Sequence, residues 1–367
     1  MKKALLLLAA LLALACIAAL PFLCAHSDLL PEVSTAYYEQ KAQNEALTAT
    51  GPEAELMRLL LGGAAVPAAA PEPTQPAFSA FGLTLAIGAA FAIALLLLLN
   101  RKLPGLRPAL LWTAALAVPM GLIGARLVYC AVNVAFYLKD ISAPEAMLRI
   151  WEGGLSLAGA LIFIGLAGVI GARLGKAPVA QVLHATVPAM YALIFTAAAG
   201  CIVIGTGYGP ELPESFFTVS IDGVARLDTA WLLIVAVSVM MIIATLRMQK
   251  VNLPADRRFA LYAFLYGSVM ILLESLRRDG HMVWGFVHAE MALDLCFALP
   301  ALLYLASTKK RILLSLLATA ALSGAVIALE FALDRSNLGD GLLYAVYAVL
   351  LGGYICLGSR FALRNAE

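Results

Sequence analysis

Ionisable side chains inside long apolar runs are the residues of this sequence that could do chemistry. Arg126, Glu274, Glu290, Asp294 and Glu330 all lie in such runs. Because a charged group is costly in the hydrocarbon of a membrane, charges that occur there usually face a cavity or a partner. We therefore expect several helices to direct these side chains to one cavity that opens to the outer leaflet and holds a polar head group.

A second candidate region lies between two apolar runs, where glycines follow Trp151 closely. Gly153, Gly154 and Ser156 stand in this stretch, and Tyr129 lies near the end of the preceding run. Glycines at that density let helix backbones approach closely or leave room for a ligand. The alternative is structural, with Trp151 as an interfacial anchor and the glycines as packing contacts.

Histidines form a third group, because His281 and His288 flank the start of another apolar run, close to Arg277. His288 with Glu290 and Asp294 offers one imidazole and two carboxylates, but no second motif of metal ligands accompanies them. Interfacial hydrogen bonding is the stronger interpretation. We therefore expect neither a metal site nor a cofactor.

The elements that must position these groups are membrane helices. The chain has 367 residues, of which 62% are hydrophobic and 13% charged, and a soluble domain has far more charge. The apolar runs are long enough to cross a bilayer as helices. The sequence predicts an all-α integral membrane protein with about ten transmembrane helices, at 4–24, 78–99, 109–136, 155–173, 180–204, 229–246, 259–276, 285–307, 312–333 and 342–358.

The distribution of basic residues predicts the orientation. Most of the 25 basic residues fall on alternate connections or at the chain ends, and such connections face the cytoplasm by the positive-inside rule. We expect a multi-pass protein of a bacterial cytoplasmic (inner) membrane, with both termini cytoplasmic. The net charge of +2 gives no sign of nucleic-acid binding, which needs a basic patch on a soluble face.

Changes in composition divide the chain into segments. Residues 1–24 predict an N-terminal membrane anchor, and the alternative is a cleaved secretory signal. Residues 25–77 form an extracytoplasmic segment whose Ala- and Pro-rich end reads as a linker. Residues 78–307 hold seven predicted helices, and 308–367 hold two more. The outer loop at 205–228 contains a possible β-hairpin.

Several of these stretches together resemble the bacterial prolipoprotein diacylglyceryl transferases. They are Gly121-Leu-Ile-Gly124-Ala-Arg126-Leu-Val-Tyr129, Arg149-Ile-Trp151-Glu152-Gly153-Gly154-Leu-Ser156, the segment from Pro188 to Tyr208-Gly209, and the segment from Tyr266-Gly267 through Glu274 to Arg277. The resemblance covers about residues 78–305. It implies a seven-helix core made from the second to the eighth predicted helices.

The resemblance also implies an activity, because members of that family transfer the diacylglyceryl group of phosphatidylglycerol to a lipobox cysteine of a prolipoprotein. Phosphatidylglycerol or a related anionic phospholipid, and prolipoprotein signal peptides, are therefore the expected partners. Lipid binding is expected at Arg126, Tyr129, Trp151, Gly153, Gly154 and Ser156. Catalysis is expected at Glu274, Arg277, His281 and His288.

Four positions depart from the family pattern. Phe81 stands where the family has tyrosine, Ala158 where it has histidine, and Ala198 and Met270 where it has arginine. Alanine cannot transfer a proton and methionine cannot neutralise a phosphate. Two functions follow: a transferase with relocated catalytic groups, or a non-catalytic relative that keeps a lipid- or lipoprotein-binding cavity. A small-solute transporter is less favoured, because inverted repeats are absent.

Overall fold

The protein is a bundle of apolar helices. The computed structural model describes residues 2–23, 78–140, 144–221, 223–243, 253–279, 282–335 and 339–363. Within these ranges nine helices are long and apolar enough to cross a membrane. They are α1 (Lys2–Leu23), α4 (Ala80–Leu99), α5 (Arg107–Val132), α6 (Leu157–Gly175), α7 (Val179–Ile204), α9 (Ala255–Ser275), α10 (Ala289–Ala306), α11 (Lys309–Arg335) and α12 (Asp340–Leu363).

The fold class predicted from the sequence is confirmed, and most helix limits fall within a few residues of the expected ones. The predicted run at 229–246 is the shorter helix α8 (Thr229–Ile242), and residues 244–252 lie outside the described ranges. The prediction that a helix begins at residue 285 was wrong. There the short strands β4 (Val283–Trp284) and β5 (Val287–His288) form an antiparallel hairpin, and α10 begins only at Ala289.

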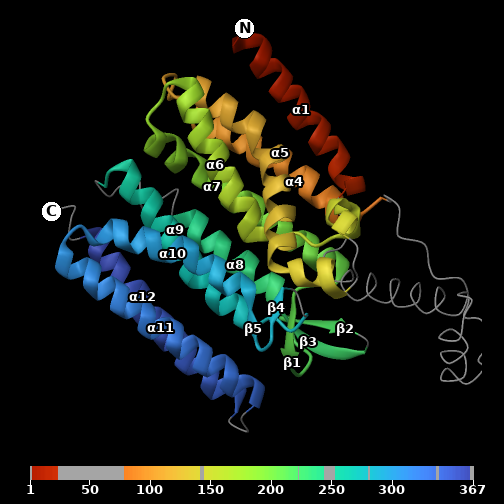
Figure 1. Ribbon diagram of the computed structural model, residues 1–367, viewed down its shortest axis with the longest axis vertical. Coiled ribbons are helices and arrows are strands. Elements are labelled where there is room, and N and C mark those ends of the chain that lie inside the picture. The colour runs from red at the N-terminus through yellow and green to blue at the C-terminus, as the bar shows by residue number, and fades with distance from the viewer. Residues whose placement is uncertain are drawn as a thin grey trace, which may run out of the picture.

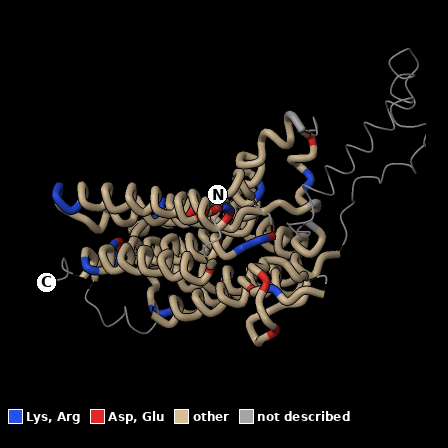
Figure 2. The backbone as a smooth tube through the Cα atoms, turned by 90° about the horizontal axis from the view of Figure 1, so that it is seen from below, with Lys and Arg blue, Asp and Glu red and all other residues tan. Residues whose placement is uncertain are grey.

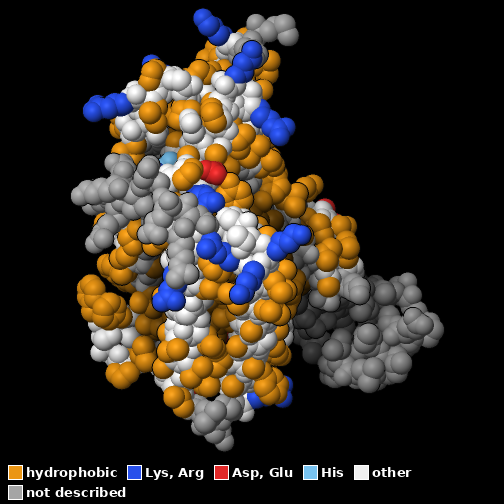
Figure 3. All heavy atoms as spheres, turned by 90° about the vertical axis from the view of Figure 1, so that its left-hand side faces the viewer, with side chains coloured by type: hydrophobic (Ala, Val, Ile, Leu, Met, Phe, Trp, Pro, Cys, Tyr) orange, Lys and Arg blue, Asp and Glu red, His pale blue; other side chains and the backbone are white. Residues whose placement is uncertain are grey.

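The helices pack in two groups that lie side by side (Figure 1). In the first group α1 contacts α4 and α5, α5 packs along α6, and α4 packs along α7. In the second, α11 and α12 cover α9 and α10. The side chains on the outside of the bundle are apolar, as Leu317 and Val349 illustrate. Figure 3 shows one long side, with a wide hydrophobic surface below the basic side chains.

Small residues explain how closely the helices approach. A Cβ atom added to Gly88 on α4 would lie 1.9 Å from the Thr196 hydroxyl oxygen on α7, and one added to Gly124 on α5 would lie 2.4 Å from the Phe163 ring on α6. Glycine at these positions removes the side chain that would hold the backbones apart. The close approach of α4 to α7 and of α5 to α6 therefore requires glycine at these two positions.

One end of the bundle carries the β-structure. Strands β1 (Tyr208–Glu211), β2 (Thr218–Ile221) and β3 (Val224–Asp228) form an antiparallel sheet in the order β1-β3-β2. The predicted hairpin is thus confirmed, with one more strand beside it. Asp228 ends β3 and caps α8, because its carboxylate accepts a hydrogen bond from the Trp231 backbone N–H at 3.0 Å.

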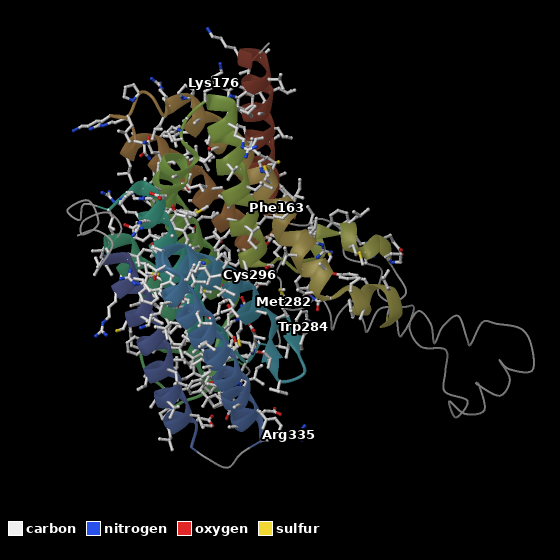
Figure 4. All side chains as sticks on the ribbon, turned by 60° about the vertical axis from the view of Figure 1, so that its left-hand side comes forward. Phe163, Lys176, Met282, Trp284, Cys296 and Arg335 are labelled. Atoms are coloured by element: carbon white, nitrogen blue, oxygen red, sulfur yellow. The ribbon has the colours of Figure 1, made fainter. Side chains whose placement is uncertain are left out.

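The connection between α5 and α6 lies at this same end and contains three short helical turns. They are a π-helical turn at Phe136–Asp140 and 3₁₀ turns at Pro144–Leu148 and Ile150–Glu152. Figure 4 shows Lys176, on the α6–α7 turn, near the opposite end, and Trp284 and Arg335 toward the end that carries the hairpins. Most of the tube in Figure 2 carries no charged residue.

The residues that flank the 24–77 segment contact each other at this end as well. The Ser79 backbone N–H donates a hydrogen bond to the Pro21 carbonyl oxygen at 2.7 Å, and the Phe22 and Phe78 rings meet edge to face with centroids 6.0 Å apart. The predicted extracytoplasmic segment at 25–77, including its linker, lies entirely outside the described residues. The chain therefore leaves and re-enters the bundle at one point.

Candidate functional site

A cavity of about 230 Å³ lies among α1 and α4 to α10. Its walls are mainly apolar, and they include Leu85, Val118, Ile164, Leu193 and Leu273. At one limit it reaches Leu96 and Thr113, which lie at the end of α4 and the start of α5. The cavity therefore runs along the helices and is suited to a hydrocarbon chain.

The charged residues that line the cavity lie at its other limit, beside the β-structure. Gly207 follows α7, Thr229 begins α8, Glu274 and Arg277 lie at the end of α9, and Glu290 lies in the first turn of α10. All five line the cavity. An apolar channel that ends in charged groups matches an amphiphile, whose tail lies along the helices and whose head group lies at this end.

Arg277 is the centre of an ion-pair network at this polar end. Its guanidinium lies 3.4 Å from the Glu274 carboxylate and 2.5 Å from the Asp279 carboxylate. Asp279 also accepts a hydrogen bond from the Gly207 backbone N–H at 3.0 Å. The network joins the end of α9 to the end of α7, so Arg277 is held in place at the cavity wall.

Two further buried acids lie on α10, which packs along α9. Glu290 and Asp294 are one turn apart on α10, and Glu290 is 4% exposed and Asp294 1%. Tyr266 on α9 is also buried. Among the described residues, no three His, Cys, Asp or Glu side chains are placed to hold a metal ion together.

Arg126 is buried away from the lining, among the turns that connect α5 to α6. Its guanidinium donates five hydrogen bonds to backbone carbonyls: Met147 (2.8 Å), Ala146 (2.7 Å), Arg149 (3.1 Å), Gly154 (3.2 Å) and Gly153. Arg126 does not line the described cavity. The fork of the guanidinium instead holds the connecting segment against α5.

The other lipid-binding residues expected beside Arg126 build the same connection. Gly153 and Gly154 both have positive φ angles, and Gly154 lies against the Tyr129 ring. Trp151 is half-buried on the second 3₁₀ turn of this connection. Only Ser156 lines the cavity, and its hydroxyl accepts a hydrogen bond from the Gly159 N–H at 3.0 Å as the cap of α6.

The expected catalytic residues divide in a similar way. Glu274 and Arg277 line the cavity, whereas His288 is buried at the start of α10 and is not a lining residue. His281 lies outside the described residues. We expected one cavity to contain all five intramembrane charges. Glu274 and Glu290 line the described cavity, whereas Arg126, Asp294 and Glu330 do not.

Three of the four positions that depart from the family pattern lie in the cavity wall. Phe81, Ala198 and Met270 line it, and Ala158 is completely buried on α6. Thr229 and Gly207 are lining residues that sequence reasoning did not find, because nothing in their local pattern marks them. Glu290 was recognisable as an intramembrane acid, although its spacing alone does not place it in the wall.

Comparison with known proteins gives one family. A family model described as "Prolipoprotein diacylglyceryl transferase" matches residues 74–307. The chain is similar to the phosphatidylglycerol–prolipoprotein diacylglyceryl transferase of Symbiobacterium thermophilum, with 27% identity over 62% of this chain and 84% of that protein. The Listeria monocytogenes enzyme of the same name is 26% identical, over 57% of this chain and 78% of its own length.

Proposed function

Because this chain belongs to the prolipoprotein diacylglyceryl transferase family, we propose that its cavity binds the diacylglyceryl part of a phospholipid for transfer to a prolipoprotein cysteine. The observation that carries the proposal is the shape of the cavity, an apolar channel that ends at Arg277 and Glu274. The relatives' names give phosphatidylglycerol and prolipoprotein as substrates.

The polar end supplies two groups that this transfer needs. In the reaction the thiol sulfur of the cysteine bonds to the terminal glyceryl carbon, and the bond from that carbon to the phosphate oxygen breaks. The phosphate leaves with the electron pair, so a nearby cation stabilises it. Arg277 is the lining cation that would do this. Glu274, 3.4 Å from Arg277, would accept the thiol proton.

A non-catalytic lipid- or lipoprotein-binding relative is the second candidate function. It is favoured by Phe81, Ala198 and Met270, which present only apolar atoms to the cavity. Such a protein would hold a diacyl lipid or a signal peptide without reaction. The 25–77 segment and the α11–α12 pair would be its added regions, outside the seven-helix core at 78–307.

The membrane orientation is part of the proposal. The protein is a multi-pass membrane protein, and its relatives are bacterial. We place it in the inner membrane with both termini in the cytoplasm. The end with the β-structure then faces outward, as does the 25–77 segment. This orientation brings the polar end of the cavity to the outer leaflet, where secreted prolipoproteins emerge.

A complementation experiment tests the transfer. The host's own transferase is depleted, this chain is expressed, and the mass of a reporter prolipoprotein is measured. Transfer adds the mass of one diacylglyceryl group. Arg277→Gln should abolish the addition, whereas Arg335→Gln, at an exposed arginine outside the cavity, should preserve it. An unchanged reporter mass with normal membrane insertion would favour the non-catalytic function.

A further inference from the structure

A second cavity, of about 800 Å³, lies at the end of the bundle opposite the β-structure. The connection between α4 and α5, the turn between α6 and α7, and the start of α9 form its walls. Figure 4 shows Lys176, a residue of the α6–α7 turn, at this end. Among their described lining residues, this cavity and the apolar cavity that ends at Arg277 share none. The two cavities are therefore separate spaces.

The charged side chains in the described part of the second cavity's wall are all basic. They are Lys102, Lys176 and Arg258. Asp256 lies in the first turn of α9 but is not a lining residue, and its carboxylate accepts a hydrogen bond from the Tyr304 hydroxyl on α10. A cavity whose described wall carries three positive charges and no negative one attracts anions.

The fold itself brings these cations together. Lys176 caps the end of α6 in a left-handed conformation, with φ of 57°. A Cβ atom added to Gly175 would lie 2.4 Å from the Ala109 backbone, so the α6–α7 turn packs directly against the start of α5. Arg258 is held at the wall because its Nε donates a hydrogen bond to the Leu253 carbonyl oxygen at 2.7 Å.

Apolar side chains line the same cavity beside the cations. They are Leu99, Leu103, Leu106 and Leu253, which lie at helix ends or in the connections. In the orientation proposed above, this end of the bundle faces the cytoplasm at the level of the inner-leaflet head groups. Basic residues just beyond the cytoplasmic ends of membrane helices attract anionic lipids.

We infer that this second cavity binds a phosphate group between Lys102, Lys176 and Arg258. Ammonium and guanidinium groups both donate charge-assisted hydrogen bonds to phosphate oxygens. An anionic phospholipid of the adjacent leaflet and inorganic phosphate from solution offer the same chemistry, and the apolar part of the wall favours the lipid.

The inferred site is independent of the proposed transfer, because it lies at the other end of the bundle. Lys102 and Lys176 belong to the first helix group, and Arg258 lies on α9 of the second group. A phosphate bound by all three would therefore connect the two groups at this end.

Hydrogen–deuterium exchange of the full chain in detergent, freed of endogenous lipid, tests the site. Phosphatidylglycerol should slow exchange severalfold in residues 100–106 and 175–181, which include the two lysines. Phosphatidylcholine with the same acyl chains has no net charge and should protect them less. An ionic strength of about 0.5 M should remove most of the protection. In a separate arm inorganic phosphate replaces the lipid, and equal protection there would assign the site to a phosphate from solution. Protection by neither would overturn the inference.

A pair of double variants locates the binding. Lys102→Gln with Lys176→Gln changes two exposed side chains, and it should raise the concentration of phosphatidylglycerol for half-maximal protection about tenfold. The matched control, Lys309→Gln with Lys310→Gln, removes two exposed lysines at the start of α11, outside the lining. It should leave that concentration unchanged. An equal effect of both double variants would show general attraction to a basic surface and contradict the site.

Discussion

The Ser275 hydroxyl on α9 donates a hydrogen bond to the Glu330 carboxylate on α11, and both residues are buried. The Ser275 carbonyl oxygen accepts a second bond from the Tyr344 hydroxyl on α12 at 3.0 Å, and Tyr344 in turn accepts from Arg278 at 2.8 Å. The two C-terminal helices are thus attached to α9 just before Arg277. They are bound to the end of α9 that carries the polar end of the cavity.

Removal of the Glu330 carboxylate should loosen this attachment. Glu330→Ala leaves the Ser275 hydroxyl without its acceptor, and a buried hydrogen bond to a charged group contributes about 2 kcal/mol. We expect a lower thermal unfolding midpoint of the detergent-solubilised protein. Glu330→Gln retains an acceptor oxygen and should lie between the wild type and the alanine variant. Identical midpoints for all three proteins would show that the contact contributes nothing.

Replacement of Arg126 by lysine should release the α5–α6 connection while it preserves the charge. Lysine cannot reproduce a planar fork that reaches five carbonyl groups, and we expect a loss of roughly 3 kcal/mol. Hydrogen–deuterium exchange should become faster in residues 144–156. The matched control is Arg107→Lys, at an exposed position on the same helix. Protection unchanged by Arg126→Lys would contradict the structural role.

Substitution of Gly154 by alanine should be far more harmful than the same change at Gly165. Gly154 has φ of +70°, and an added Cβ atom would lie 2.3 Å from the Tyr129 ring. The left-handed conformation alone costs an alanine about 1 kcal/mol, and the clash adds to it. Gly165 is helical with open space around it, so alanine there should be neutral or slightly stabilising. The yield and unfolding midpoint of the two variants decide between these outcomes.

Met270→Arg should strengthen the binding of an anionic head group. Position 270 lies in the cavity wall, one turn before Glu274 on the same face of α9, so the new guanidinium can pair with that carboxylate. We expect native mass spectrometry of the purified protein to show severalfold more bound phosphatidylglycerol than in the wild type, and reporter transfer to rise in the complementation assay. Met270→Leu changes no charge and is the control. A gain with leucine as well would assign the effect to packing.

The helices of this protein were predictable because backbone N–H and C=O groups in hydrocarbon have no water to bond and must form hydrogen bonds within the protein. The long apolar run now seen as α7, for example, leaves no alternative to a helix, since its backbone groups must bond internally. The hairpin before α10 was missed for the opposite reason. Its Val283, Trp284 and Val287 are apolar, and hydropathy does not distinguish an apolar strand from the first turn of a helix.

The site was less predictable, because a charged side chain in an apolar run can either bond to backbone groups of the protein or face a cavity. Arg126 and Glu290 both stand in apolar runs, and sequence reasoning placed both in one cavity. The backbone carbonyls that surround Arg126 come from residues 146–154, and carbonyl groups are present in every residue, so no sequence pattern marks them. Glu290 lacks such partners for Oε1 and faces the cavity. The difference arises from tertiary packing alone.

The hydrogen bond between Ser79 and Pro21 makes residues 24–77 an insertion between two points that already touch. Because the two ends of this segment are already in contact, the helices do not fix its length. A longer segment costs little, since each doubling of a loop adds only about 0.6 kcal/mol of closure entropy. Evolution can therefore lengthen, shorten or exchange this segment without a change in the bundle. In protein engineering the same junction is the natural place to graft a foreign domain onto this end of the bundle.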